Sequence, residues 1–233
     1  MTKIRYLLTI VVLGCTAPIR AETIDVTTAI GSGPTLQFRQ GVKADPPLSS
    51  FNTFLTGRAN DRIGPRTYRG YLIFNLSAVT MPVSSAEIRL IQGVVETPDP
   101  FETVNVHDVT TPIAELFSTS SAAAIYDDLA SGVFYGSGSD YFDGADNSTI
   151  KSIFLNAAGI NAINANLGGV FAVGLSLDSI IPRQLEKELI GFRGTFPPPA
   201  LRLTLVPEPS AFAIGATSLF AVSAIRRRAS IAR

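Results

Sequence analysis

Residues 68–76 read YRGYLIFNL and residues 86–91 read AEIRLI, and these two segments decide the fold class. Apolar and polar residues alternate strictly in the second segment, which is typical of a β-strand with one buried face. The first segment is a longer and mostly apolar run of strand length. Together they predict a protein built mainly from β-strands.

Similar short runs recur along the chain, and each is bounded by Gly, Pro, Asp, Asn or Ser. They cover residues 24–27, 36–39, 104–107, 133–135, 150–155, 170–177, 189–192 and 201–205. About ten strands of this kind in one body predict an all-β, antiparallel fold, either a two-sheet β-sandwich or a jelly roll.

Few segments have the pattern of a helix. In residues 156–168, Asn156 can cap a helix, apolar residues at positions 160, 163 and 167 share one face, and Gly168 can end it. Residues 111–117 and 122–129 predict two shorter helices in a long connection between strands.

The composition excludes several classes of site. The 233 residues include one Cys and one His, so we expect no disulfide scaffold, no multi-cysteine or multi-histidine metal centre and no cofactor. The net charge of zero hides an uneven distribution, because residues 22–207 hold 12 basic and 18 acidic side chains. This acidic body would be repelled by phosphate, and we expect no nucleic-acid partner.

The N-terminus has the order of a secretory signal peptide. Lys3 and Arg5 precede an apolar core at residues 6–13, and a cleavage site follows Ala21, so that the mature chain would begin at Glu22. Two alternatives remain open. Residues 12–15 read VLGC, which resembles a lipoprotein box whose Cys is acylated, and the segment could instead be a buried strand or helix.

The C-terminus has three parts in a fixed order. The first is a short motif, Val206, Pro207, Glu208, Pro209 and Ser210. The second, residues 211–225, has no charge, and with the two residues before it could span about 26 Å as a helix. The third, residues 226–233, contains Arg226, Arg227 and Arg228, which would keep this end in the cytoplasm.

This tripartite tail resembles a PEP-CTERM sorting signal of bacterial exported proteins. The resemblance implies a membrane-embedded exosortase as partner, transient anchoring in the inner membrane, and removal of the tail near the PEP motif. It also implies delivery to the cell surface or an extracellular polysaccharide matrix. The alternative is an ordinary C-terminal anchor.

The body has a resemblance of its own. Residues 69–77, RGYLIFNLS, followed by residues 83–90, VSSAEIRL, look like a paired motif of secreted bacterial β-sandwich modules. Some of those modules bind polysaccharide, and others occur in PEP-CTERM proteins. Asn75 stands where that motif usually has Asp, so any role of that carboxylate is in doubt.

Three groups of side chains could carry chemistry, and each has a simpler structural explanation. His107 and Asp108 could begin a catalytic site, but no G-x-S-x-G motif accompanies them, and His107 fits a strand residue. Oxygen ligands in a Gly-rich loop could bind Ca²⁺, although a solvated turn explains them as well; they are Asp140, Asp143, Asp146 and Asn147. The third group consists of tyrosines that could form aromatic platforms for sugars or could pack in the core or at its edge. Its members are Tyr68, Tyr71, Tyr126, Tyr135 and Tyr141.

Four arginines are spaced almost as on one helix face, at positions 58, 62, 66 and 69. Gly64 and Pro65 break that helix, so we expect a loop with dispersed Arg rather than an anion site.

We therefore expect a signal peptide at residues 1–21, a β-sandwich body at residues 22–205 and a sorting tail at residues 206–233. The expected function is that of a non-enzymatic surface or matrix protein without catalytic or metal-binding residues. A carbohydrate-binding module for exopolysaccharide is the alternative, and a secreted hydrolase is the third possibility.

Overall fold

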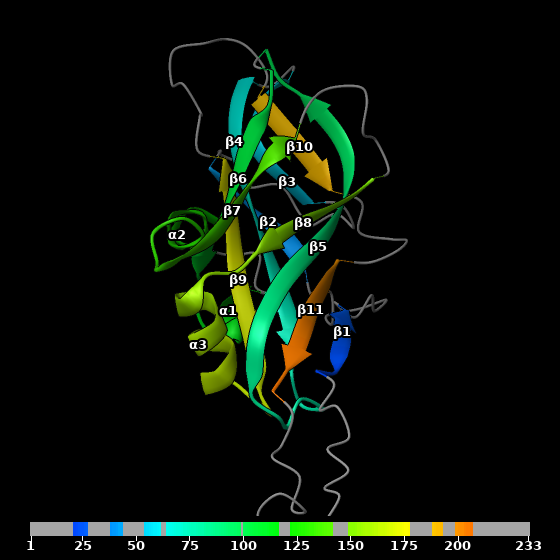
Figure 1. The fold of residues 1–233 in the computed structure, drawn as a ribbon. Coiled ribbons are helices and arrows are strands. Elements are labelled where there is room, and N and C mark those ends of the chain that lie inside the picture. The colour runs from blue at the N-terminus through cyan, green and yellow to red at the C-terminus, as the bar shows by residue number, and fades with distance from the viewer. Residues whose placement is uncertain are drawn as a thin grey trace, which may run out of the picture. The chain divides into compact units, whose positions relative to one another are not determined.

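One long strand, β5 (Val83–Glu96), takes part in two antiparallel sheets in the computed structural model of the chain (Figure 1). Its first part pairs with β11 (Ala200–Leu205) and β8 (Ile150–Phe154), and its last residues pair with β10 (Glu188–Phe192). The body is therefore an all-β, sandwich-like fold, as the alternating segments predict.

The structure describes part of the chain. The described residues are 21–27, 38–43, 54–61, 64–98, 100–116, 122–141, 149–177, 188–192 and 199–206.

We call the two sheets A and B. Sheet A runs β1 (Thr23–Thr27), β11, the first part of β5, and β8. Sheet B runs from the last part of β5 through β10, β3 (Phe54–Asp61), β4 (Gly64–Asn75), β9 (Val170–Leu177), β6 (Glu102–Asp108) and β7 (Phe134–Tyr141). The strand β2 (Phe38–Lys43) pairs with β4 outside this order.

The core lies between the sheets and follows from alternation along each strand. In β11, Leu201, Leu203 and Leu205 are buried and the residues between them are partly exposed. The same alternation buries Ile88 and Leu90 of β5, which join one continuous apolar cluster with residues of β4, β6 and β9. Burial of these side chains is the main favourable term in folding of the body.

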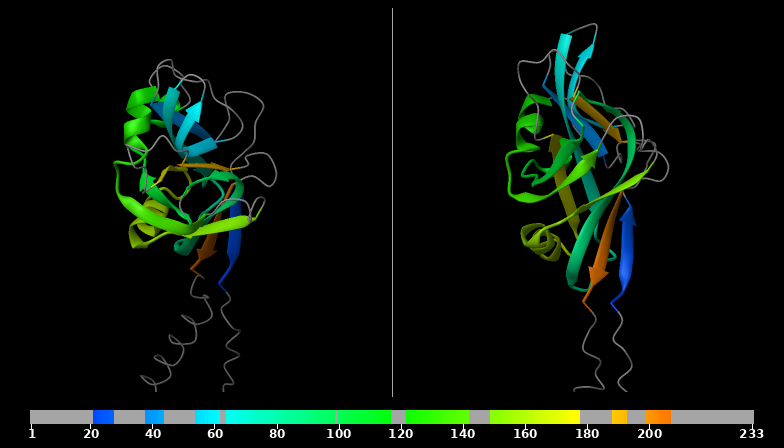
Figure 2. Two further views of the ribbon diagram at one scale, coloured as in Figure 1. Left: turned by 90° about the horizontal axis from the view of Figure 1, so that it is seen from above. Right: turned by 45° about the horizontal axis from the view of Figure 1, so that its top comes forward.

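The run of mostly apolar residues in β4 arises because this strand is buried on both of its faces. Leu72 and Phe74 enter the core between the sheets, whereas Tyr71 and Ile73 point to the other face of sheet B. On that face they pack against two short helices, α1 (Ile113–Leu116) and α2 (Ala122–Asp128), which supply Leu116, Ile125 and, just after α2, Leu129 (Figure 2). A strand buried on both faces needs apolar residues at successive positions.

The helical layer approaches sheet B closely at Gly174. A Cβ atom at this position would lie 2.3 Å from the carbonyl oxygen of Leu129 and 2.7 Å from its Cα. Only glycine therefore allows the end of α2 to rest directly on β9.

The third helix, α3 (Ala157–Ala165), begins where its sequence predicts, after the Asn156 cap, but it ends earlier than predicted, with Asn166 rather than Gly168 as its C-cap. The side chain of Asn156 accepts a hydrogen bond of 3.1 Å from Gly159 N, and Gly168 follows the helix with φ +74°. The side chain of Asn164 fixes the helix to sheet A, because it accepts from Val83 N (2.8 Å) and donates to Val83 O (3.0 Å).

Most predicted elements are confirmed, with two differences. The strand β3 was not predicted, because its sequence, FLTGRAND, does not alternate apolar and polar residues. The loop predicted around the four arginines is wrong, since β3 and β4 form a hairpin in which Asp61 pairs with Gly64. The glycine and proline that would break a helix stand at the start of the second strand of that hairpin.

Candidate functional site

The one histidine and its neighbouring aspartate do not act together. Successive residues of a strand point to opposite faces, and in β6 Val104 and Val106 face the core. His107 packs its ring edge-on against Phe134, with 5.7 Å between ring centroids, and its buried Nδ1 has no hydrogen-bond partner among the described residues. Asp108 therefore does not orient this imidazole through Nδ1, so the described structure lacks the Asp–His hydrogen bond of a Ser–His–Asp triad at this position.

Asp108 is instead held by a tyrosine from the neighbouring strand. The hydroxyl of Tyr135 in β7 donates a hydrogen bond of 2.9 Å to Oδ1 of Asp108. The Tyr135 ring is buried and stacks on Phe171, with 6.0 Å between centroids. Burial raises the pKa of Tyr135, and the hydrogen bond to the Asp108 carboxylate and its negative charge raise it further. Tyr135 is thus a fixed donor that orients an acceptor.

This pair lies at a cleft of about 210 Å³ next to the last residue of β6, the start of β9, and helices α1 and α3. Four lining residues carry polar side-chain atoms: Asp108, Thr111, Tyr135 and Asn166. The other lining residues are Val109, Pro112, Ile113, Ala162, Val170, Phe171 and Ala172. The cleft therefore combines apolar walls with a few hydrogen-bonding groups, as small-molecule sites do.

Asp128, at the end of α2, shapes the wall that carries Thr111. Its carboxylate accepts hydrogen bonds from the hydroxyl groups of Thr110 and Thr111, both 2.6 Å, and from their backbone nitrogens. Burial by itself would raise the pKa of Asp128, but these hydrogen bonds outweigh it, and the pKa lies below the ordinary value. Asp127 and Asp128 are the last two residues of α2.

The charge of the cleft is negative. Asp108 is the sole carboxylic acid among the lining residues that the structure describes, and none of these is Lys or Arg. A second carboxylate, that of Asp128, binds directly to Thr111 of the wall. Such a site offers hydrogen-bond acceptors to hydroxyl or amino groups and opposes the entry of anions.

The sequence pointed to tyrosines as possible sugar platforms, and the structure places four of the five in the interior. Tyr68, Tyr71, Tyr126 and Tyr135 are each at most 6% exposed, so core packing explains them. Tyr141 lies at the end of β7 opposite Glu102. The platform interpretation is therefore wrong for the four buried rings, because a covered ring face cannot stack on a sugar.

Of the four regularly spaced arginines, Arg69 has a structural role. Arg69 lies over the ring of Tyr126, 4.1 Å from its centroid, and donates a hydrogen bond of 2.7 Å to the Tyr126 carbonyl. This contact fixes α2 to β4. Arg58 and Arg66 lie on β3 and β4, and position 62 is outside the described residues.

Asn75 has a structural role in the turn that follows β4. Its side-chain oxygen accepts a hydrogen bond of 2.9 Å from the backbone nitrogen of Ser77, which shapes the turn after β4. Either an amide or a carboxylate oxygen can fill this role, so an Asp at position 75 could form the same turn.

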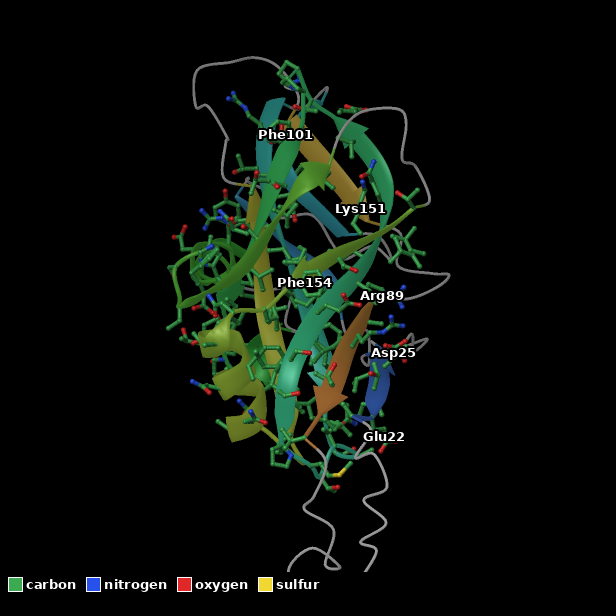
Figure 3. The ribbon with its side chains drawn as sticks, in the orientation of Figure 1. Glu22, Asp25, Arg89, Phe101, Lys151 and Phe154 are labelled. Atoms are coloured by element: carbon green, nitrogen blue, oxygen red, sulfur yellow. The ribbon has the colours of Figure 1, made fainter. Side chains whose placement is uncertain are left out.

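The outer face of sheet A carries a second notable group of side chains. The strand registers place Asp25, Arg202, Glu87 and Phe154 in one row across β1, β11, β5 and β8. Arg202 binds both carboxylate oxygens of Asp25, at 2.8 and 2.9 Å, and Arg89 lies 3.8 Å from the same carboxylate (Figure 3). Phe154, at the end of the row, is 71% exposed. Sequence spacing could not reveal this row, because its members come from four strands.

The two ends of the compact unit Glu22–Glu208 lie at neighbouring strands, β1 and β11. Leu205 N donates a hydrogen bond of 2.8 Å to Glu22 O, and Val206 N donates one of 2.7 Å to Pro82 O. Glu22 thus lies beside the end of β11. The other predicted sorting residues, at positions 207–210 and 226–228, lie outside the described residues, as does Cys15.

The calcium interpretation stays a prediction. Asp140 lies in β7, and residues 143, 146 and 147 are outside the described part of the chain. Within that part, no group of three His, Cys, Asp or Glu side chains could hold a metal ion.

No protein-family model matches this sequence, and no curated protein matches it either. None of the helices in the described ranges has both the length and the apolar character needed to span a membrane.

Proposed function

We propose that this is a non-enzymatic exported protein that is sorted to the cell surface or the extracellular matrix by its C-terminal tail. In this proposal residues 1–21 are a cleaved signal peptide. Residues 206–210 are the motif that an exosortase-type enzyme processes, and residues 211–225 are a transient transmembrane helix. The basic residues at 226–228 orient that helix in the inner membrane.

One structural observation carries the proposal. The compact body spans Glu22–Glu208, and its first described strand begins two residues after the predicted cleavage point. Its last strand ends at Leu205, immediately before the predicted motif. Both processing steps would therefore cut at the boundaries of the body and leave its strands intact.

The sorting signal is tested by replacing Pro207-Glu208-Pro209 with three alanines in a host that carries an exosortase. The variant should insert but stay unprocessed in the inner membrane, because the extended segment that the enzyme recognises is lost. Fractionation and apparent mass report the result. If the variant still reaches the surface in shortened form, the tail is only a hydrophobic anchor.

A matched pair of variants tests the basic tail. Replacing Arg226, Arg227 and Arg228 by Glu should impair orientation and sorting, whereas replacing all three by Lys should preserve them, because only charge is required. Equal sorting of the two variants would contradict the proposed role of charge.

The N-terminal assignment has its own measurement. The exported protein should begin at Glu22, as determined by N-terminal sequencing or intact mass. A mature chain that begins at an acylated Cys15 would show a lipoprotein instead.

A second candidate function is binding of exopolysaccharide, and the cleft beside Asp108 favours it. An oriented carboxylate, a threonine and an asparagine beside apolar walls can bind the hydroxyl groups and C–H faces of a sugar ring. The hydrolase alternative is tested by incubating the protein with exopolysaccharides and measuring new reducing ends. A binding protein without catalytic residues should release none.

A further inference from the structure

We propose that the cleft beside Asp108 binds one neutral sugar unit of a polysaccharide and rejects sugars that carry a carboxylate. This inference deepens the second candidate function above and rests on it. Surface sorting can be correct whether or not the cleft binds a sugar.

The size of the cleft limits the ligand. Sites for drug-sized molecules typically measure ~300–1,000 Å³. The cleft measures about 210 Å³, which suits a single ring rather than several consecutive units. A polysaccharide would therefore place one unit in the cleft and leave its neighbours at the surface.

The ability of the Asp108 carboxylate to accept further hydrogen bonds indicates that the ligand should carry donor groups. An ionised carboxylate has two oxygens and accepts hydrogen bonds but cannot donate them. Tyr135 donates to Oδ1, and Oδ2 is the second acceptor of the same carboxylate. Hydroxyl groups of a sugar can donate to this second oxygen, and the buried phenol keeps the carboxylate in place while they do so.

The walls fit the remaining surface of a sugar ring. Val170 is 41% exposed at the start of β9, and Ala162 of α3 lines the cleft as well. These small apolar side chains can contact C–H groups of the sugar. The side-chain nitrogen of Asn166 donates a hydrogen bond of 2.8 Å to Ala162 O, and its amide oxygen can accept a hydrogen bond from the ligand.

Charge decides between classes of sugar. A uronic acid would bring a second carboxylate close to Asp108, with Asp128 behind Thr111 and no basic side chain among the lining residues. Like charges at short distance in a partly enclosed site repel strongly. Neutral hexoses have no such penalty, so the cleft should discriminate by charge.

The test compares sugars that differ only at C6. Oligosaccharides of glucose, galactose and mannose are titrated into the full-length protein in detergent micelles, in parallel with those of the corresponding uronic acids. Calorimetry should show binding of at least one neutral member and at least tenfold weaker binding of its uronic acid. Binding should also change little with salt, because the ligand carries no charge. No binding of any neutral oligosaccharide, or equal or tighter binding of a uronic acid, would overturn the proposal.

Variants place the binding in the cleft. Asp108→Asn should weaken binding at least tenfold, and Val170→Phe should abolish it by filling the rim. Ile150→Phe, a similar enlargement at a residue that is 48% exposed on β8 outside the cleft, should bind as the unchanged protein does. Each variant is first shown to melt cooperatively.

The exposed aromatic side chain on sheet A is the competing site for a sugar. If Phe154→Ala abolishes binding while Val170→Phe leaves it unchanged, the sugar binds on the outer face of sheet A and the cleft proposal is wrong.

Discussion

The hydroxyl of Tyr135 donates a hydrogen bond to Asp108 from inside the core, so that a buried donor on β7 orients an acceptor at the cleft. The two residues are 27 positions apart in sequence and are joined by the pairing of β6 with β7. This relationship leads to the first prediction.

Tyr135→Phe should preserve the fold and lower the free energy of unfolding by about 1 kcal/mol, the usual value of one hydrogen bond. The substitution keeps the ring that stacks on Phe171 and removes only the donor. Denaturant unfolding measures the change.

The same variant checks the ionisation of Tyr135. Because burial and Asp108 raise the pKa of Tyr135, its phenol should stay protonated at a pH equal to the ordinary tyrosine pKa of ~10. The change in phenolate absorbance up to that pH should be equal in the two proteins. A smaller change in Tyr135→Phe would show that Tyr135 titrates normally.

Asp25 should make the stability of the body depend on pH in the acidic range. The hydrogen bonds from Arg202 lower the pKa of Asp25 against a smaller opposing effect of burial, and the charges of Arg202 and Arg89 lower it further. A carboxyl whose pKa is lower in the folded state stabilises the fold above its unfolded pKa. That contribution is lost as the pH falls through the folded pKa.

Asp25→Asn should therefore cost about 0.5–1 kcal/mol at pH 7, a modest value because the Asp25 side chain is 40% exposed. The difference from the unchanged protein should shrink as the pH falls below the ordinary Asp pKa of ~3.9, and it should vanish below the folded pKa of Asp25, where both side chains are neutral. Asp127→Asn, a change at an exposed acid, serves as the control and should have little effect at either pH.

Asn164 should be the most important polar residue of α3 for stability. Asn164→Ala removes both hydrogen bonds to the backbone of Val83 and leaves those backbone groups partly buried, which should cost about 2 kcal/mol. Asn161→Ala, at an exposed position of the same helix, should be neutral or slightly stabilising because Ala favours helix. Similar losses in the two variants, measured by urea unfolding, would contradict the role of Asn164.

Gly174→Ala should separate the helical layer from sheet B. The new methyl group would collide with the Leu129 backbone, and the required shift should cost about 2 kcal/mol or more. Gly168→Ala meets nothing within 4 Å and should cost only the strain of its positive φ, about 1 kcal/mol. Hydrogen exchange should increase in α2 for the first variant alone.

Local pattern in the sequence was enough to place most of the strands and the start of α3. Alternation along β11 and the Asn156 cap depend on neighbours within a few residues, and a sequence displays such neighbours directly. The strand β3 escaped prediction because its residues form a ladder with β4 and β10 without an alternating pattern of their own.

The cleft and the charged row on sheet A depend on strand pairing between distant segments. Nothing near Asp108 in the chain indicates that Tyr135 would bind it, and the row from Asp25 to Phe154 joins four strands by register. The sequence also suggested that some tyrosines, which are in fact buried, could be surface platforms. The burial of Tyr71 on the second face of β4 could not be predicted locally, because it arises only when α1 and α2 pack there. Local periodicity determines which segments become strands, whereas contacts across the sheets determine which side chains meet, since strand register brings together residues whose separation along the chain carries no periodic signal.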